Sequence, residues 1–471
     1  MNVNQQIKHI DKGEIYLQLK KNDIHQIEII DLTHEAQGVA KINDYTLFVE
    51  DALPDEHVEC KLLKLNKSYG FAKTINILKA SPHRQEPFCP VFKRCGGCAF
   101  QHFKYEAQLD YKTRYVREVL KRIGGMNNVK VNNTLGMKEP YYYRNKVLTP
   151  VAKDKNGNAV AGFYAKRSHF VVDTDKCYIQ DKTCDDIRNI LRQFINDKKI
   201  SIYDEEKSHG LLRHIMVRKG FKTGEVMVVL VINGDLLPFS DDLIDILKDN
   251  VDNFKSLVLN INKKKTNVAL GEKNIILFGN PYIRDYIGDF IFNISPISFF
   301  QVNPVQTEIL YTKALEFCKL TGNETVFDLY CGTGTISLFL SKHASKVYGV
   351  EVVEQAVQDA KNNAALNNVN NVEFLKGEAE TIVPALYEKG IAADVVVVDP
   401  PRKGCEVSLL ESIAKMTPKR IVYVSCNPAT LARDLKFLKG EGYEVVEVQP
   451  VDMFPWTGHI ETVAVMSKAN L

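Results

Sequence analysis

The carboxyl-terminal part of the chain alternates short apolar strands with helix-like stretches, and this pattern constrains the fold most. From residue 286 onward the runs "TVFDLY", "KVYGVE", "ADVVVVD" and "IVYVS" are separated by segments such as "EQAVQDAKNNAALN". Such alternation is typical of a parallel sheet with helices on both faces. It predicts a doubly wound, Rossmann-like α/β domain over residues 286–471, with its ligand site at the carboxyl ends of the strands.

Two further regions precede this domain, so the predicted fold is multidomain α/β. Residues 1–80 alternate apolar and polar residues in short runs separated by turn residues. This predicts a small antiparallel OB-like β-barrel of about five strands, a fold that often binds oligonucleotides. Residues 81–285 begin with a proline-rich joint and continue as a β-rich central region. That region includes a basic helix over 101–125, which we expect to pack against the catalytic domain.

The composition of the 471 residues is that of an ordinary globular protein, with 45% hydrophobic and 25% charged residues. No segment approaches the roughly 20 apolar residues that cross a membrane. The polar amino-terminal residues lack the apolar core of a signal peptide, so we expect a cytoplasmic protein. A net charge of +3 does not by itself indicate nucleic acid. Disulfides are not expected among the ten cysteines in a reducing compartment.

The stretch "ETVFDLYCGTGTISLFLSK" predicts a strand, a tight glycine turn and a helix. Gly332 and Gly334 allow the backbone to turn sharply beside a ligand, although Ser337 stands where a dinucleotide fingerprint has a third glycine. The next strand ends in Glu351, 23 residues after Asp328. A carboxylate there can accept hydrogen bonds from both ribose hydroxyls of NAD or of S-adenosylmethionine.

The next two strands decide between these cofactors. "DVVVVDPPRKG" places Asp399 at a strand end, in a pattern common where methyltransferases hold a nucleobase. The stretch "IVYVSCNPATLARDL" predicts the next strand and, from Pro428, a helix. Cys426 lies between them, at the carboxyl end of the strand. Hydride transfer needs no thiol, so Cys426 favours S-adenosylmethionine.

A thiol beside a methyl donor suits methylation of the C5 atom of uracil. Addition of a thiolate to C6 makes C5 nucleophilic, and a base must then remove the C5 proton before the thiol leaves. The helix that begins at Pro428 and the side chain of Arg402 can favour the thiolate. For the base, "GHIETVAVM" offers Glu461, with His459 as the reserve on the same face of a strand.

The motifs "SFFQVN", "DLYCGTG", "GVE", "DPPRKG", "SCNPATLARDL" and "FPWTGHIET" occur in the order in which they occur in the RNA uracil-5-methyltransferases, and the chain resembles that family. The resemblance implies that Cys426 is the nucleophile and Glu461 the base. It also implies that four residues surround S-adenosylmethionine, of which the first two come from the resemblance alone: Gln301, Tyr330, Glu351 and Asp399.

A cluster of cysteines lies in "CPVFKRCGGC", which contains Cys89, Cys95 and Cys98. Cys177 is the best candidate for a fourth thiol, with Cys184 as the reserve. Four thiolates suit either zinc or a 4Fe-4S cluster, and three close ligands with one remote ligand are typical of iron–sulfur ligation. Within the family that the chain resembles, the ribosomal-RNA members carry a leading TRAM barrel and a 4Fe-4S cluster with this spacing. The resemblance therefore implies a 23S rRNA (uracil-5-)-methyltransferase, which we expect to act as a monomer.

The expected RNA surface combines the barrel, the basic helix and "YYYRNKV". In this stretch Tyr141, Tyr142 and Tyr143 can stack on bases, while Arg144 and Lys146 can meet phosphates.

Three alternatives stay open. The first is methylation of transfer RNA. The second is cytosine-5 methylation, which uses the same thiol chemistry but often a second cysteine where this chain has Arg402. The third is a non-catalytic RNA-binding assembly factor, which the presence of both the thiol and the base disfavours.

Overall fold

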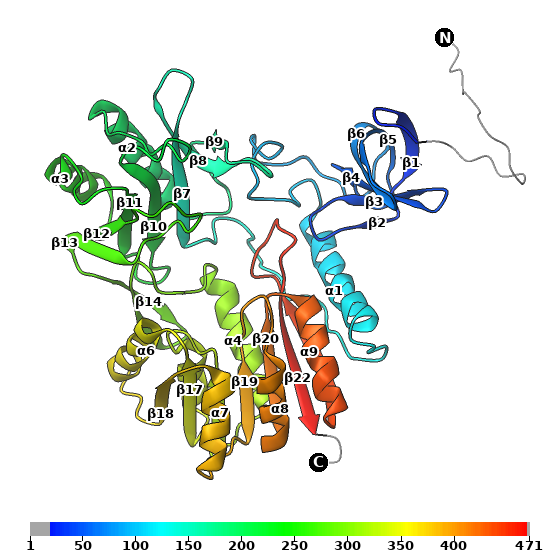
Figure 1. Cartoon of the computed structure of the whole chain (residues 1–471), viewed down its shortest axis with the longest axis vertical. Coiled ribbons are helices and arrows are strands. Elements are labelled where there is room, and N and C mark those ends of the chain that lie inside the picture. Colours follow the sequence, from blue (N-terminus) through cyan, green and yellow to red (C-terminus); the bar gives the residue numbers. More distant parts are fainter. Residues whose placement is uncertain (1–18, 469–471) are drawn as a thin grey trace, which may run out of the picture. The chain divides into compact units, whose positions relative to one another are not determined.

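The computed structural model describes residues 19–468, which form two compact units (Figure 1). The first unit comprises the described residues up to Phe88 together with Ala99–Ala107. The second comprises Cys89–Cys98 and the residues from Gln108 onward. Across residues 19–468, every helix is too short or too polar to cross a membrane.

The first unit is a six-stranded β-sheet domain with the strand order β1-β5-β6-β4-β3-β2. Its strands are β1 (Ile24–Glu28), β2 (Asp31–Leu32), β3 (Gly38–Ile42), β4 (Tyr45–Glu50), β5 (His57–Leu65) and β6 (Tyr69–Lys79). Alternate side chains of β5, Val58, Cys60 and Leu62, are fully buried in its core. The six strands of the described residues are close to the predicted number of about five. The prediction of an antiparallel barrel was wrong for one pairing, because β4 pairs with β6 in parallel. The alternation of apolar and polar residues along a strand does not indicate which strand it pairs with, or in which direction.

The second unit begins with a mixed seven-stranded sheet, ordered β13-β12-β11-β10-β7-β8-β9, which we call the central sheet. Its strands are β7 (Lys146–Lys153), β8 (Ala159–Tyr164), β9 (Val171–Asp173), β10 (Leu212–Lys219), β11 (Val226–Ile232), β12 (Phe254–Ile261) and β13 (Lys273–Gly279). Side chains of α2 (Lys182–Asp197) and α3 (Ser240–Asn250) pack with one face of this sheet in a single core. Residues of the other face, such as Met216 and Val229, belong to a core shared with the carboxyl-terminal domain.

The predicted doubly wound domain is present, as a seven-stranded sheet ordered β18-β17-β16-β19-β20-β22-β21. Its strands are β16 (Thr325–Leu329), β17 (Lys346–Glu351), β18 (Val372–Lys376), β19 (Val395–Val398), β20 (Arg420–Ser425), β21 (Tyr443–Val451) and β22 (Glu461–Lys468). All neighbours pair in parallel except that β22 runs antiparallel to both β20 and β21.

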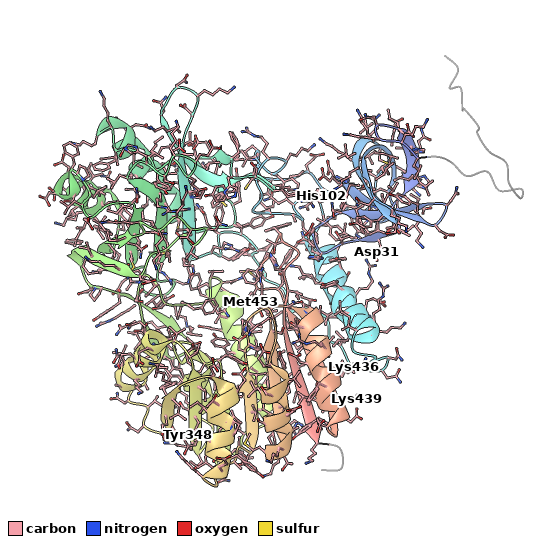
Figure 2. The ribbon with its side chains drawn as sticks, in the orientation of Figure 1. Asp31, His102, Tyr348, Lys436, Lys439 and Met453 are labelled. Atoms are coloured by element: carbon pink, nitrogen blue, oxygen red, sulfur yellow. The ribbon has the colours of Figure 1, made fainter. Side chains whose placement is uncertain are left out.

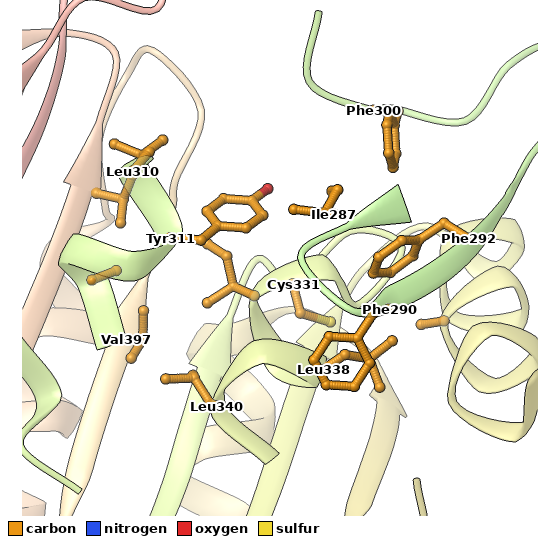
Figure 3. Packing of buried hydrophobic residues seen from close by; sticks show 14 of the residues in the cluster. Ile287, Phe290, Phe292, Phe300, Leu310, Tyr311, Cys331, Leu338, Leu340 and Val397 are labelled. Atoms are coloured by element: carbon orange, nitrogen blue, oxygen red, sulfur yellow. The ribbon is translucent and has the colours of Figure 1, made fainter. Parts of the chain in front are cut away.

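Helices cover both faces of this sheet. One core contains side chains of α4 (Pro304–Cys318), α5 (Thr335–Ser341) and α6 (Glu354–Leu366), together with the β-ribbon of β14 (Ile283–Ile287) and β15 (Phe290–Ile294). Figure 3 shows Tyr311 of α4 and Leu338 of α5 in this core, together with Phe290 of β15. The other core contains side chains of α7 (Ala379–Glu388), α8 (Val407–Met416) and α9 (Pro428–Gly440). On α9 most apolar side chains are buried, whereas Lys436 and Lys439 are exposed (Figure 2).

Helix α1 (Tyr105–Arg122) is shorter at both ends than the predicted 101–125. Its Val116 and Leu120 are buried in the same core as α8 and α9. Ile123, inside the predicted range but beyond the end of α1, is 43% exposed. Lys112 was expected on a basic surface, but its side chain is fully buried and pairs with Asp452 at 2.6 Å.

The strand order defines where a ligand binds. The chain runs from β16 outward through β17 to β18, and then returns to the other side of β16 with β19 and β20. The carboxyl ends of β16 and β19 therefore flank the point where the direction of winding reverses. Ligands of open α/β sheets bind at such a switch point.

Candidate active site

A cavity of about 1170 Å³ lies at this edge of the sheet. Every side chain predicted for the cofactor and for catalysis lines it, the reserve base included: Gln301, Tyr330, Glu351, Asp399, Cys426, His459 and Glu461. Residues that are up to 160 positions apart in the chain thus meet in one place.

The glycine turn after β16 adopts the left-handed backbone that it was predicted to need. Gly332 has φ 54° and Gly334 has φ 80°. A Cβ atom on Gly334 would lie 2.7 Å from Cζ of Phe374, so this position excludes any side chain. The hydroxyl of Ser337 donates a hydrogen bond to Oδ2 of the buried Asp328 at 2.5 Å. This bond explains why a serine stands in place of a third glycine.

Backbone amides hold Glu351 at the end of β17. Its carboxylate accepts hydrogen bonds from the N–H groups of Gly332, at 3.1 Å, and Val353, at 2.8 Å. The neighbouring Tyr330 has φ 66°, and its hydroxyl donates to Oε1 of Glu380 at 3.0 Å. The turn and the next strand therefore present a fixed carboxylate and a fixed phenol ring to the cavity.

Burial changes the acidity of the carboxyl groups at the switch point. It raises the pKa of Asp399 to about 7, and the charge of Asp328 adds to this rise. Burial likewise raises the pKa of Asp328 to about 7. Near neutral pH each of these groups therefore exists in both protonation states.

Cys426 lies between β20 and α9, as predicted. Its neighbour Asn427 caps α9 by accepting a hydrogen bond from the N–H of Ala429 at 3.1 Å, and Pro428 is the first helical residue. Because Ser425 pairs with Thr462 in the antiparallel ladder, extending the register places Cys426 opposite Glu461.

The thiol of Cys426 is protonated in the resting protein. Burial raises its pKa to about 11, and the charges of Glu461 and Asp399 add to the rise. The guanidinium of Arg402 acts in the opposite direction. We expected the surroundings of Cys426 to favour its thiolate form. Burial favours the protonated thiol instead, and its effect is larger than that of Arg402.

The two candidate bases differ in their surroundings. Glu461 is only 5% exposed, and burial, followed by the charge of Asp399, raises its pKa well above the usual range. His459 is exposed, and its ring contacts Phe454 edge-on at 6.0 Å between centroids. The expectation that both lie on one face of a strand was wrong, because β22 begins at Glu461 and His459 belongs to the preceding loop.

Helix α9 also holds the loop that follows Asp399, which sequence reasoning missed. The side chains of Asn427 and Thr430 donate to the carbonyl of Arg402 at 3.1 and 3.3 Å. One turn further, Asp434 accepts from the N–H of Cys405 at 2.9 Å. These positions share one face of a helix, so their spacing in "NPATLARD" is a signal that was available.

The four predicted cluster cysteines are all half-buried, whereas the reserve, Cys184, is buried in the apolar core under α2. Burial raises the pKa of Cys89, and a charge on Cys95 adds to the rise, so these two thiols lie near each other. Across residues 19–468, however, no three Cys, His, Asp or Glu side chains are gathered closely enough to hold a metal ion. The four thiols are therefore suitable donor atoms for a cluster, but they are not gathered around one centre.

The tyrosines expected to stack on RNA differ from one another. Tyr141 and Tyr142 are partly exposed, at 37% and 36%. Tyr143 is buried and donates from its hydroxyl to the carbonyl of Pro455 at 3.1 Å, so its predicted availability for stacking was wrong. The two cations expected to meet phosphates, Arg144 and Lys146, both line the cavity.

Comparison with known proteins agrees with this geometry. Residues 224–469 match the family described as tRNA (Uracil-5-)-methyltransferase, and residues 18–75 match the TRAM domain. Proteins described as uncharacterized RNA methyltransferases are similar over nearly their whole length. One from Clostridium acetobutylicum is 51% identical over 97% of this chain and 100% of its own. One from Halalkalibacterium halodurans is 52% identical over 96% of this chain and 98% of its own.

A solved structure is also similar over nearly the whole chain. It is the tRNA (uracil-54, C5)-methyltransferase of Pyrococcus abyssi in complex with S-adenosyl-L-homocysteine. It superposes with a TM-score of 0.74 at 30% identity and covers 94% of this chain and 100% of its own.

The doubly wound sheet, its glycine turn and the cavity at the switch point define an S-adenosylmethionine-dependent methyltransferase. Within that class, the chain belongs to the RNA uracil-5-methyltransferase family and carries a TRAM domain.

Proposed function

We propose that this protein methylates C5 of a uridine in 23S ribosomal RNA through a covalent bond between Cys426 and C6. The observation that carries the chemistry is that Cys426 and Glu461, at facing ends of β20 and β22, line the same cavity as the glycine turn. We assign the binding of S-adenosylmethionine to Gln301, Tyr330, Glu351 and Asp399. When bound, S-adenosylmethionine supplies the methyl group.

Cys426 acts first in this proposal. Its Sγ atom adds to C6 of the uracil, and the electrons of the C5–C6 bond make C5 nucleophilic. The thiol must lose its proton to do so, and its pKa of about 11 makes the thiolate scarce near neutral pH. Arg402 lowers that pKa, so its guanidinium assists the addition.

Glu461 acts after C5 has gained the methyl group. Its carboxylate removes the C5 proton, and the C6–Sγ bond then breaks to release the product. A carboxylate whose pKa is raised by burial is a stronger base than an exposed one, which suits this step. His459 is exposed and belongs to the loop before β22, so it is the weaker candidate.

Substitution of the two residues tests these roles separately. Cys426→Ala should bind S-adenosylmethionine but form no covalent adduct with RNA that contains 5-fluorouridine, because fluorine cannot leave as a proton. Cys318→Ala, which changes a buried thiol that does not line the cavity, is the control. An adduct that persists in Cys426→Ala would overturn the assignment.

Glu461→Gln should stop the reaction after methyl transfer. A general base contributes roughly 10²–10⁴ in rate, so labelled methyl groups should accumulate in a protein–RNA band on a denaturing gel. Normal turnover in Glu461→Gln, with loss of turnover in His459→Ala, would assign the base to His459.

The choice of ribosomal RNA rests on the TRAM domain together with the four-cysteine set. Transfer RNA is the alternative, because the similar Pyrococcus abyssi protein is named for uridine 54 of tRNA. Mapping 5-methyluridine in ribosomal and transfer RNA from cells with and without the gene decides between them. A loss confined to transfer RNA would refute the proposal. Cytosine methylation is disfavoured because Cys405 is 4% exposed and does not line the cavity.

We also propose that Cys89, Cys95, Cys98 and Cys177 hold a 4Fe-4S cluster that organises the RNA-binding region. Two observations support this proposal. All four thiols are half-buried, and Cys95 forms an isolated antiparallel bridge with Ala165. Protein purified without air should be brown and contain about four iron atoms per chain. A colourless, active protein that holds one zinc ion would refute the cluster.

A further inference from the structure

A second cavity, of about 300 Å³, lies on the central sheet, and the proposed reaction gives it no role. We call it the central-sheet cavity. Tyr164 and His169 supply aromatic rings to its wall, and Phe163, Leu148 and Pro150 also line it.

The central-sheet cavity and the active-site cavity are reached from the same face of β7. Lys146 lines the active-site cavity, whereas Leu148 and Pro150 line the central-sheet cavity. Successive side chains of a strand alternate between its faces, so these three residues share one face. At about 3.3 Å per residue, Lys146 and Pro150 lie about 13 Å apart along β7. The two cavities therefore border β7 about 13 Å apart, a separation that a few nucleotides of one RNA strand can span.

One wall of the central-sheet cavity is built by Arg213. Its guanidinium stacks on the ring of Tyr203 at 4.4 Å and donates to the backbone carbonyls of Asn262 and Lys264, each at 2.9 Å. These bonds fix the loop of residues 262–269, whose last four residues line the cavity. The same loop carries three exposed lysines, of which Lys263 and Lys264 pair with Asp235 and Glu272. Lys265 is at a position suited to a phosphate of an RNA strand.

The polar groups of the cavity suit a base better than a phosphate. His214 is 8% exposed, and its Nδ1 atom has no hydrogen-bond partner in the described part of the chain. Burial lowers its pKa to about 4, so near neutral pH its ring is uncharged and offers one donor and one acceptor. Glu205 also lines the cavity, and its negative charge opposes a phosphate inside.

We propose that the central-sheet cavity receives a second unstacked nucleobase of the RNA substrate, near the uridine that is methylated. The inference rests on the proposed action on RNA and extends it to how the substrate is recognised. Aromatic rings stack on the base, while His214 meets its polar edge.

Binding measurements on the full-length protein test this proposal. The probe is the ribosomal RNA fragment that the protein protects from ribonuclease, prepared with each nucleotide flanking the target uridine made abasic in turn. Val268 lines the cavity and is 64% exposed, so Val268→Glu should fold normally while placing a carboxylate at the cavity. Tyr164→Ala removes a stacking ring. Leu236→Glu, at an 80% exposed position that does not line the cavity, is the control.

Each cavity variant should bind intact RNA about 5- to 150-fold more weakly than the wild type, the range expected for one stacked base. One abasic position should weaken binding to the wild type by a similar factor and add no loss in the variants. If the loss of affinity from a cavity variant and the loss from an abasic nucleotide add at every position, the cavity assignment is wrong. Methylation of the same fragment is measured in parallel. Failure of the wild type to methylate any uridine would count against the proposed function, not against the cavity.

Discussion

The buried ion pair between Lys112 and Asp452 provides a quantitative test of how the catalytic domain is held together. Both side chains are fully buried, and Nζ of Lys112 lies 2.6 Å from Oδ1 of Asp452. Lys112→Met leaves the Asp452 carboxylate buried without this ammonium group. Breaking a buried pair in this way costs about 3–5 kcal/mol, which lowers the ratio of folded to unfolded protein by roughly 10²–10⁴.

The only tryptophan of the chain allows this loss of stability to be measured in the second unit. Trp456 lies four residues after Asp452, is 1% exposed and donates from its indole N–H to the carbonyl of Pro140 at 2.7 Å. Urea unfolding followed by its fluorescence therefore reports on the second unit. Because the chain has two units, only this local transition is interpreted as a free energy.

Two further variants make the test specific. Lys121→Met removes an exposed lysine from the same helix and should change the free energy of unfolding by less than about 0.5 kcal/mol. Lys112→Met combined with Asp452→Leu removes both charges and should recover most of the loss, because apolar replacement of a buried pair is often neutral. A loss below about 1 kcal/mol for Lys112→Met, or no recovery in the double variant, would refute the reasoning.

Three other predictions follow from the site. Arg402→Gln should shift the pH profile of adduct formation with 5-fluorouridine RNA to higher pH, because Arg402 lowers the pKa of Cys426; an unchanged profile would contradict this. Asp399→Asn should stabilise the protein against urea increasingly between about pH 4 and pH 7, because the raised pKa of Asp399 costs the wild type stability as pH rises through that window; an effect independent of pH would disprove it. Gly334→Ala should abolish S-adenosylmethionine binding in calorimetry, whereas Gly440→Ala, in a helix with open space around it, should be neutral or slightly stabilising.

The parts of the site that were predicted from the sequence depend on local chemistry. The boundary between β20 and α9 could be placed because Asn427 and Pro428 are a cap and a first-turn residue whatever surrounds them. The glycine turn could be placed because Gly334 has no alternative at its backbone angle. The partners of the long strand β6 could not be predicted, because pairing with β4 depends on contacts between segments far apart in the chain.

Lys112 is an instructive error, because the signal was present. Leu109, Lys112, Val116 and Leu120 follow the spacing of one helical face, so the lysine lies within the apolar stripe rather than beside it. A lysine in that position requires a buried anion. The sequence alone does not identify the anion, because Asp452 is 340 residues away.

The protonation states of the acid groups in the cavity show how a buried site can provide a strong base. Burial raises the pKa values of Asp399, Cys426 and Glu461 together, so these three groups bind protons rather than concentrate negative charge. The sulfonium of S-adenosylmethionine carries a positive charge, which lowers the pKa of any acid near it. The sulfonium loses this charge when its methyl group is transferred, so a carboxylate beside it then regains the high pKa that burial imposes. For Glu461 this makes the carboxylate a stronger base at the step that removes the C5 proton.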